Sequence, residues 1–135
     1  MKKVVVIDGQ GGRLGRLLIE SILKDNLSCD LYAIGTNSIA TAAMLKAGAL
    51  HGATGENPVL VSVRDADIVI GPIGIISAES LLGEVTPNIA VAVGQSPAVK
   101  LLIPVGHCNN QVIGVQDMSL NDMVRTAVER MKTLL

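Results

Sequence analysis

Aromatic residues are nearly absent from this chain of 135 residues, which has one tyrosine and no phenylalanine or tryptophan. Proteins that bind single-stranded nucleic acid stack the bases on aromatic rings, so this class is excluded. An excess of positive charge is missing too, because 11 basic and 12 acidic residues leave a formal net charge of −1. Binding to double-stranded nucleic acid requires a basic surface. We therefore expect no nucleic-acid partner.

Cysteines and long apolar runs are also scarce. Cys29 and Cys108 are too few for a disulfide framework, and together with two histidines they form no closely spaced pair of zinc ligands. No apolar stretch approaches the ~20 residues that a membrane span needs. The apolar start, residues 4–7, is too short for a signal peptide. The sequence predicts a cytoplasmic protein of a reducing bacterial cytosol, with no metal and no membrane partner.

Apolar residues are abundant, at 49% against 17% charged residues, which is enough to bury the core of one domain over residues 1–135. Short β-branched runs that end at glycine alternate with segments of helical periodicity. Uniformly apolar strands are typical of a parallel sheet with helices on both faces. We therefore expect an α/β, Rossmann-like doubly wound fold, with a mostly parallel sheet of strand order 3-2-1-4-5.

The periodicity places the expected elements along the chain. Strands are expected at residues 4–7, 31–34, 49–51, 68–70, 100–104 and 112–115. The last two are separated by about six residues, too few for a parallel crossover, so the sixth strand should be antiparallel at the sheet edge. Helices are expected up to residue 24, from a cap at Thr36 or Asn37 to Ala47, over about 75–82, from Thr86 to about Gly94, and after a cap at Ser119. Residues 58–65 fit a short helix, although 59–61 fit a strand equally well.

The main functional signal is the glycine turn, residues 9–15, which follows the first strand and opens a helix. Its glycines fit G-x-x-G-x-x-G and G-x-G-x-x-x-G, two variants of the dinucleotide fingerprint. Glycine lacks the Cβ that would hold a phosphate away, and a helix start offers unpaired N–H groups and a positive dipole end. The competing interpretation is close packing alone. We favour phosphate binding because the turn has the required strand and helix on either side. The expected cofactor-binding residues of the turn are Gly9, Gln10, Gly11, Gly12, Arg13, Leu14 and Gly15.

Residues 4–22 resemble the first unit of atypical short-chain dehydrogenases and NmrA-like NADP-binding proteins. The resemblance implies that Gly9, Gly12 and Gly15 occupy the glycine positions of these proteins, and that Arg13 reaches an adenosine phosphate. The chain departs from the enzymes in having no Tyr-x-x-x-Lys pair, since Tyr32 is the sole tyrosine and falls in an expected strand. Their usual proton donor is therefore missing.

Over its whole length the chain resembles a bacterial family of small proteins defined as a domain of unknown function. The resemblance rests on the runs at residues 7–12, 35–37, 40–49, 52–57 and 71–75. It implies a Rossmann-like fold and brings no activity with it.

Two further groups of residues are expected to bind the cofactor. Thr36 and Asn37 stand where NAD-binding domains carry an acid for the ribose hydroxyls. The missing carboxylate favours NADP, a mononucleotide or another anion over NAD, although capping of the second helix also explains both residues. The loop that ends the fourth strand should face the glycine turn across the switch point, with a plain tight turn as the alternative. Its residues are Gly71, Pro72, Ile73 and Gly74.

Other polar residues are expected at the carboxyl edge of the sheet, on the substrate side. They are His51, Thr54, Glu56, His107, Cys108 and Asn109. A Cys-His pair can act as a nucleophile with its base. Neighbouring side chains in the sequence diverge, however, so a polar loop is favoured over catalysis at residues 107–109.

The sequence therefore predicts a protein that binds a small phosphorylated ligand on the glycine turn, with NADP or another nucleotide as the cofactor. Whether it is an enzyme stays open, because no catalytic pair is recognisable. One alternative is an NADP-dependent oxidoreductase with unfamiliar acid-base residues. The other is a regulatory or assembly subunit whose glycine turn is structural. The apolar face of the last helix is core, or else the surface of a homodimer.

Overall fold

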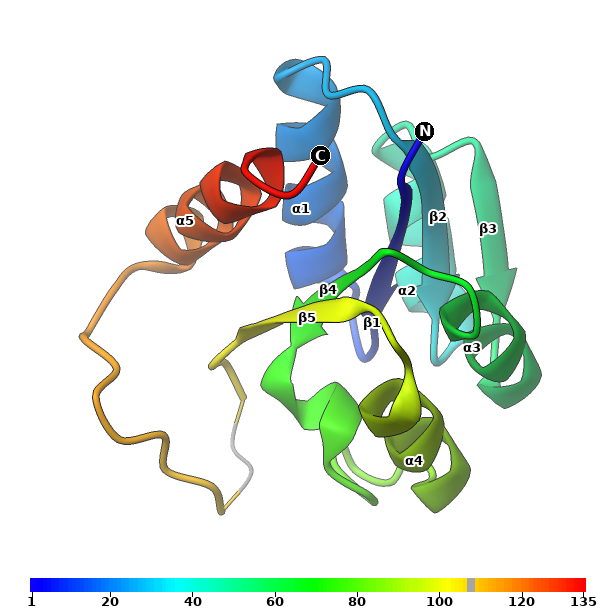
Figure 1. The fold of residues 1–135 in the computed structure, drawn as a ribbon. Coiled ribbons are helices and arrows are strands. Elements are labelled where there is room, and N and C mark those ends of the chain that lie inside the picture. Colours follow the sequence, from blue (N-terminus) through cyan, green and yellow to red (C-terminus); the bar gives the residue numbers. More distant parts are fainter. Residues whose placement is uncertain (107–108) are drawn as a thin grey trace.

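The fold is a five-stranded parallel sheet with helices on both faces (Figure 1). The computed structural model describes residues 1–106 and 109–135. Its strand order, β3-β2-β1-β4-β5, confirms the expected doubly wound arrangement. The strands are β1 (Lys3–Asp8), β2 (Asp30–Gly35), β3 (His51–Thr54), β4 (Ile68–Pro72) and β5 (Val99–Ile103).

Helices α1, α2 and α5 cover one face of the sheet, and α3, α4 and a short 3₁₀ helix, η1, cover the other. Their bounds are α1 (Arg13–Lys24), α2 (Ser38–Lys46), α3 (Glu56–Val63), η1 (Ile73–Ile76), α4 (Pro87–Gln95) and α5 (Leu120–Lys132). Several start where the sequence predicts a cap. Asn37 accepts the N–H of Ala40, and Ser119 accepts the N–H of Asp122. Each such cap stabilises a helix by about 1 kcal/mol.

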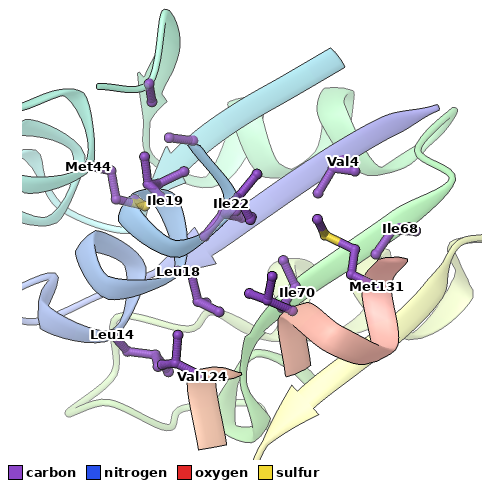
Figure 2. Packing of buried hydrophobic residues seen from close by; sticks show 14 of the residues in the cluster. Val4, Leu14, Leu18, Ile19, Ile22, Met44, Ile68, Ile70, Val124 and Met131 are labelled. Atoms are coloured by element: carbon purple, nitrogen blue, oxygen red, sulfur yellow. The ribbon is translucent and has the colours of Figure 1, made fainter. Parts of the chain in front are cut away.

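Strand β1 is the centre of the core. Val4, Val5, Val6 and Ile7 are all fully buried, because β1 pairs with β2 on one side and β4 on the other while helices cover both faces. Val4 and Val6 belong to the cluster on the α1 and α5 side, shown in Figure 2 with Leu18, Met44, Ile70 and Met131 among its members. Val5 and Ile7 belong to the cluster under α3 and α4. The two-sided burial explains why this strand is uniformly apolar.

The prediction of a sixth strand is wrong, because residues 112–115 form a turn and no strand. Gly114 has a φ of +88° there, and Ile113 is 92% exposed. Residues 112–115 are all exposed, so their β-branched side chains have no packed surface to stabilise an extended pairing.

The prediction of a helix over residues 75–82 is also wrong. After η1 the chain forms successive turns, in which Glu79, Leu81 and Leu82 have φ values of +67°, +55° and +57°. The N–H of Glu79 bonds the carbonyl of Val85, which closes a local loop in place of a helical turn. We call residues 77–86 the η1–α4 loop.

The structure also decides the bounds of the third strand and the conformation of residues 58–65. The third strand is His51–Thr54, later than expected, because residues 51–54 pair in register with residues 32–35 of β2. Residues 58–65 are helical, as part of α3, and the strand alternative is wrong. Helix α3 begins after Gly55, not after the expected Asn57 cap.

Helix α5 packs its apolar face inward. Val124, Val128 and Met131 are buried against α1 and the sheet, so this face is core within the chain (Figure 2). Among the described residues, no helix is both long and apolar enough to cross a membrane.

Candidate functional site

The glycine turn connects β1 to α1 through a tight bend. The N–H of Gly12 bonds the carbonyl of Gly9 at 2.9 Å, and Gly12 has a φ of +75°. Gln10 also lies in the left-handed region, with a φ of +49°. Gly12 is the N-cap of α1 and supplies no side chain to the helix start. The first N–H groups of the helix therefore need hydrogen-bond acceptors from other parts of the molecule or from a ligand.

Three backbone donors in and near the turn are taken by two carboxylates of the protein. Oδ2 of Asp8 accepts the N–H of Gly15 at 2.6 Å, and Oδ1 accepts that of Gly9 at 2.8 Å. The N–H of Gln10 bonds Oε1 of Glu84 at 2.9 Å. Among the described residues, no acceptor bonds the N–H of Gly11, Arg13 or Leu14. These three groups are the free donors of the turn.

Three of the four glycines in the turn are required by packing. A Cβ on Gly9 would lie 2.5 Å from Oγ1 of Thr36, and one on Gly12 would lie 2.7 Å from Cα of Ala40. A Cβ on Gly15 would lie 2.6 Å from Sδ of Met44. These distances are shorter than carbon contacts permit. A Cβ on Gly11 would meet nothing within 4 Å. Packing therefore explains Gly9, Gly12 and Gly15, and leaves Gly11 unexplained.

Asp8 is buried at the base of the turn, where it ends β1. Burial raises the pKa of its carboxyl group; the N–H groups of Gly15 and Gly9 lower it, and the nearby Glu84 charge raises it, with a net increase. Its two hydrogen bonds fix the turn against the strand. Asp8 was not among the expected site residues, although its position directly before the turn was visible in the sequence.

A carboxylate does stand at the end of β2, contrary to the expectation from Thr36 and Asn37. Oε1 of Glu84, from the η1–α4 loop, accepts Oγ1–H of Thr36 and Nδ2–H of Asn37, both at 2.7 Å. The same Asn37 amide donates to the carbonyl of Gln10. Burial raises the pKa of Glu84, but the hydrogen bonds from Gln10, Thr36 and Asn37 lower it more, so the carboxylate is ionised at neutral pH.

A pocket of about 310 Å³ opens over the turn. All residues from Asp8 to Leu14 line it, opposite Pro72 at the end of β4. Because all five strands are parallel, their carboxyl ends meet at one edge, and the pocket lies where the strand order reverses between β1 and β4. The sequence did not predict the rest of the lining, Leu81, Val105, Gly106 and Leu120.

Of the expected residues 71–74, which form the end of β4 and the start of η1, only Pro72 lines this pocket. A Cβ on Gly71 would lie 2.2 Å from the carbonyl oxygen of Ile7, so this glycine permits the close approach of β4 to β1. Ile73 lines a neighbouring hollow of about 390 Å³ that shares Val105 and Gly106 with the pocket. Gly74 is buried, and its carbonyl accepts the hydroxyl of Ser80.

The expected substrate-side residues lie away from the pocket. Oγ1 of Thr54 is 2.7 Å from Oγ1 of Thr41, and Glu56 bonds Thr86 at the start of α4. His51 begins β3 and stacks on Tyr32 with ring centroids 5.0 Å apart, so it is not at the carboxyl edge.

The remaining candidates follow β5. His107 and Cys108 lie outside the described residues, and Asn109 is exposed. In the described part of the chain, no three His, Cys, Asp or Glu side chains gather as a metal site would require.

The family model described as "Domain of unknown function (DUF3842)" matches residues 3–135. The chain belongs to this family. The match confirms the whole-length resemblance seen in the sequence. Among curated proteins, none matches this DUF3842 sequence.

One solved structure is similar to the chain at 17% identity and a TM-score of 0.48. It is the crystal structure of a dodecameric FMN-dependent UbiX-like decarboxylase from Escherichia coli O157:H7. The match covers 98% of this chain and 77% of that one. A likeness this weak supports no conclusion about ligand or activity, which have to be argued from the site itself.

Proposed function

We propose that this chain binds a small phosphorylated ligand in the pocket over the glycine turn. The phosphate would accept the free N–H groups of Gly11, Arg13 and Leu14. The observation that carries this proposal is the set of three unbonded donors at the start of a helix of 12 residues, on the wall of a pocket of about 310 Å³. A helix start favours an anion through its aligned peptide dipoles as well as its N–H groups.

Two features favour a phosphate over a purely structural turn. Gly11 is exposed, has no neighbour within 4 Å of a Cβ, and needs no left-handed backbone, so packing gives no reason for a glycine there. A phosphate that approaches the backbone closely does give one. Arg13 is exposed, is the first residue of α1 and lines the pocket, where its guanidinium would be a bidentate partner for phosphate oxygens.

Among the described residues, the pocket lining holds no acid-base pair of the kind a dehydrogenase uses. Tyr32 bonds Asp30 and stacks on His51, and neither ring lines the pocket. Asp8 and Arg13 are its ionisable lining residues among those described. No observation therefore favours the oxidoreductase alternative, and we propose a binding function.

The pocket between α3 and α4 is larger, at about 450 Å³, but it is less suited to a phosphate. Arg64 is its one charged lining residue among those described, and the start of the neighbouring α4 is already capped by the side chain of Thr86. The glycine turn combines donors, charge and a position at the switch point, which the larger pocket does not.

The test is a thermal-shift panel of inorganic phosphate, sugar phosphates, AMP, ATP, GTP, cyclic nucleotides, FMN, NAD(H) and NADP(H). A ligand at a hundredfold its Kd stabilises the folded state by ~2.7 kcal/mol. The diagnostic variant is Gly11→Glu, which places a carboxylate among the free donors. Gly94→Glu is the matched control, because Gly94 is exposed on α4 and a Cβ there also meets nothing within 4 Å.

Gly11→Glu should lose the stabilisation by ligand while Gly94→Glu keeps it. An equal response of both variants would place the ligand elsewhere. If no phosphorylated compound stabilises the unsubstituted protein, the proposed function is wrong.

A further inference from the structure

Glu84 forms the densest hydrogen-bond cluster beside the glycine turn. Its Oε1 accepts three donors from two segments: the N–H of Gln10 at 2.9 Å, the hydroxyl of Thr36 at 2.7 Å and the amide of Asn37 at 2.7 Å. Gln10 directly precedes Gly11, the first of the free donors. The carboxylate is therefore next to the proposed phosphate site, where the carboxyl ends of β1 and β2 meet.

The second oxygen of this carboxylate is available. In the described part of the chain, Oε2 of Glu84 has no hydrogen-bond partner, while Oε1 is saturated. Glu84 is half-buried and lies beside the pocket: it does not line the pocket itself, but Gln10, whose N–H it accepts, does. A carboxylate oxygen accepts hydroxyl donors and repels a second anion.

We propose that Glu84 binds the free ribose hydroxyls of a nucleotide whose phosphate lies on the glycine turn, and that it excludes nucleotides phosphorylated at the 2′ position. This inference rests on the proposed function. It reverses the preference for NADP that the sequence favoured, because that preference depended on a missing carboxylate at this point. The residue that supplies the carboxylate comes from the η1–α4 loop, 47 positions beyond Asn37 in the chain.

The fold holds Glu84 in place at some energetic cost. A Cβ on Gly9 would lie 2.8 Å from Oε1 of Glu84, so a larger residue there would have to displace this carboxylate. Three non-glycine residues of the η1–α4 loop, Glu79, Leu81 and Leu82, have left-handed backbones. Backbone strain of this kind persists only where surrounding contacts over-determine it. The Glu84 cluster is one of those contacts.

The specificity follows from charge. A 2′-phosphate would bring about two negative charges to an ionised carboxylate that has no cation among its hydrogen-bond partners. A 2′-hydroxyl would instead donate a hydrogen bond to that carboxylate. Discrimination of this type combines an attraction for one ligand with a repulsion of the other.

The experiment compares 5′-AMP with adenosine 2′,5′-bisphosphate by isothermal titration calorimetry, since the two differ only in the 2′-phosphate. The unsubstituted protein should bind 5′-AMP at least tenfold more tightly, and 2′-deoxy-AMP more weakly than 5′-AMP. In Glu84→Gln the ratio of the two Kd values should fall towards one. The matched control is Glu79→Gln, which removes an exposed carboxylate from the same loop and should leave the ratio unchanged.

The outcomes separate this inference from the proposed function. Equal affinities in the unsubstituted protein, or a ratio unaffected by Glu84→Gln, overturn the role of Glu84 and leave phosphate binding intact. Binding of inorganic phosphate or sugar phosphates without any binding of 5′-AMP also overturns it. If no phosphorylated compound binds, both proposals fall. Circular dichroism and thermal unfolding without ligand show whether Glu84→Gln keeps the fold.

Discussion

Oδ2 of Asp8 accepts the backbone N–H of Gly15 at 2.6 Å, across the turn that joins β1 to α1. The protein thus supplies its own acceptor for one donor in the first turn of α1. Glu84 does the same for Gln10. What is left for an external anion is the stretch between them, with the N–H groups of Gly11, Arg13 and Leu14. Variants at these positions separate what the turn does for folding from what it does for binding.

Gly12→Ala should destabilise the protein by roughly 1–3 kcal/mol, because its Cβ would lie 2.7 Å from Cα of Ala40 and its φ is +75°. Gly11→Ala should change stability by less than about 1 kcal/mol, and in the stabilising direction if at all, since its backbone and surroundings accept a Cβ. Urea denaturation of both variants measures the difference. Equal losses would show that close packing of α1 on α2 is not what requires Gly12.

Asp8→Asn should destabilise the protein by roughly 1–3 kcal/mol, because an amide cannot accept the N–H groups of both Gly9 and Gly15. The loss should depend on pH. Burial raises the pKa of Asp8 above its usual value near 3.8, so the folded state binds this proton more tightly than the unfolded state. The contribution of that proton to stability is complete below pH 3.8 and is lost as pH rises through the folded pKa.

The stability difference between the unsubstituted protein and Asp8→Asn should therefore shrink from pH 4 towards pH 7. Chemical denaturation across this range measures it, and taking the difference cancels the other titrating groups. A difference that grows with pH would contradict the raised pKa.

Glu84→Gln should show the opposite trend. Burial raises the pKa of Glu84, but the bonds from Gln10, Thr36 and Asn37 outweigh it, and the net pKa lies below the usual 4.5. The stability that Glu84 contributes is then present above pH 4.5 and is lost as pH falls through the folded pKa. The unsubstituted protein should be more stable than Glu84→Gln at pH 6, with the gap closing on acidification.

Met131→Ala should cost roughly 2–5 kcal/mol, because Met131 is fully buried between α5 and the sheet. Leu82→Ala should change stability by less than about 0.5 kcal/mol, since Leu82 is 96% exposed. Thermal or urea unfolding compares them. A small loss for Met131→Ala would mean that the apolar face of α5 contributes little to the core, which would favour a role for it between subunits.

The sequence predicted what local signals determine. The run of β-branched residues before the glycine turn, the helix after it and the caps at Asn37 and Ser119 are all present in the structure. The alternation of strands and helices also predicted the strand order. Periodicity and cap chemistry can be recognised in a few neighbouring residues. The strand order then follows from the right-handedness of parallel crossovers.

What the sequence did not predict depends on contacts between distant segments. Glu84 is far from Thr36 and Asn37 along the chain, and only the fold brings its carboxylate to them. The packing reasons for Gly12 and Gly15 come from Ala40 and Met44 of α2. The apolar run at 112–115 predicted a strand because burial cannot be known from a short run alone.

The central position of β1 has a consequence for the order in which the molecule is made. β1 leaves the ribosome before the other strands of the sheet, yet β4 is the partner for its second edge, and residues 68–72 are synthesised much later. At about 5–20 residues per second, the nascent chain carries an apolar strand with one open edge for several seconds. Open apolar edges pair readily with other chains. A fragment that ends before β4 should therefore aggregate, and we expect the productive folding step to wait for the second half of the sheet.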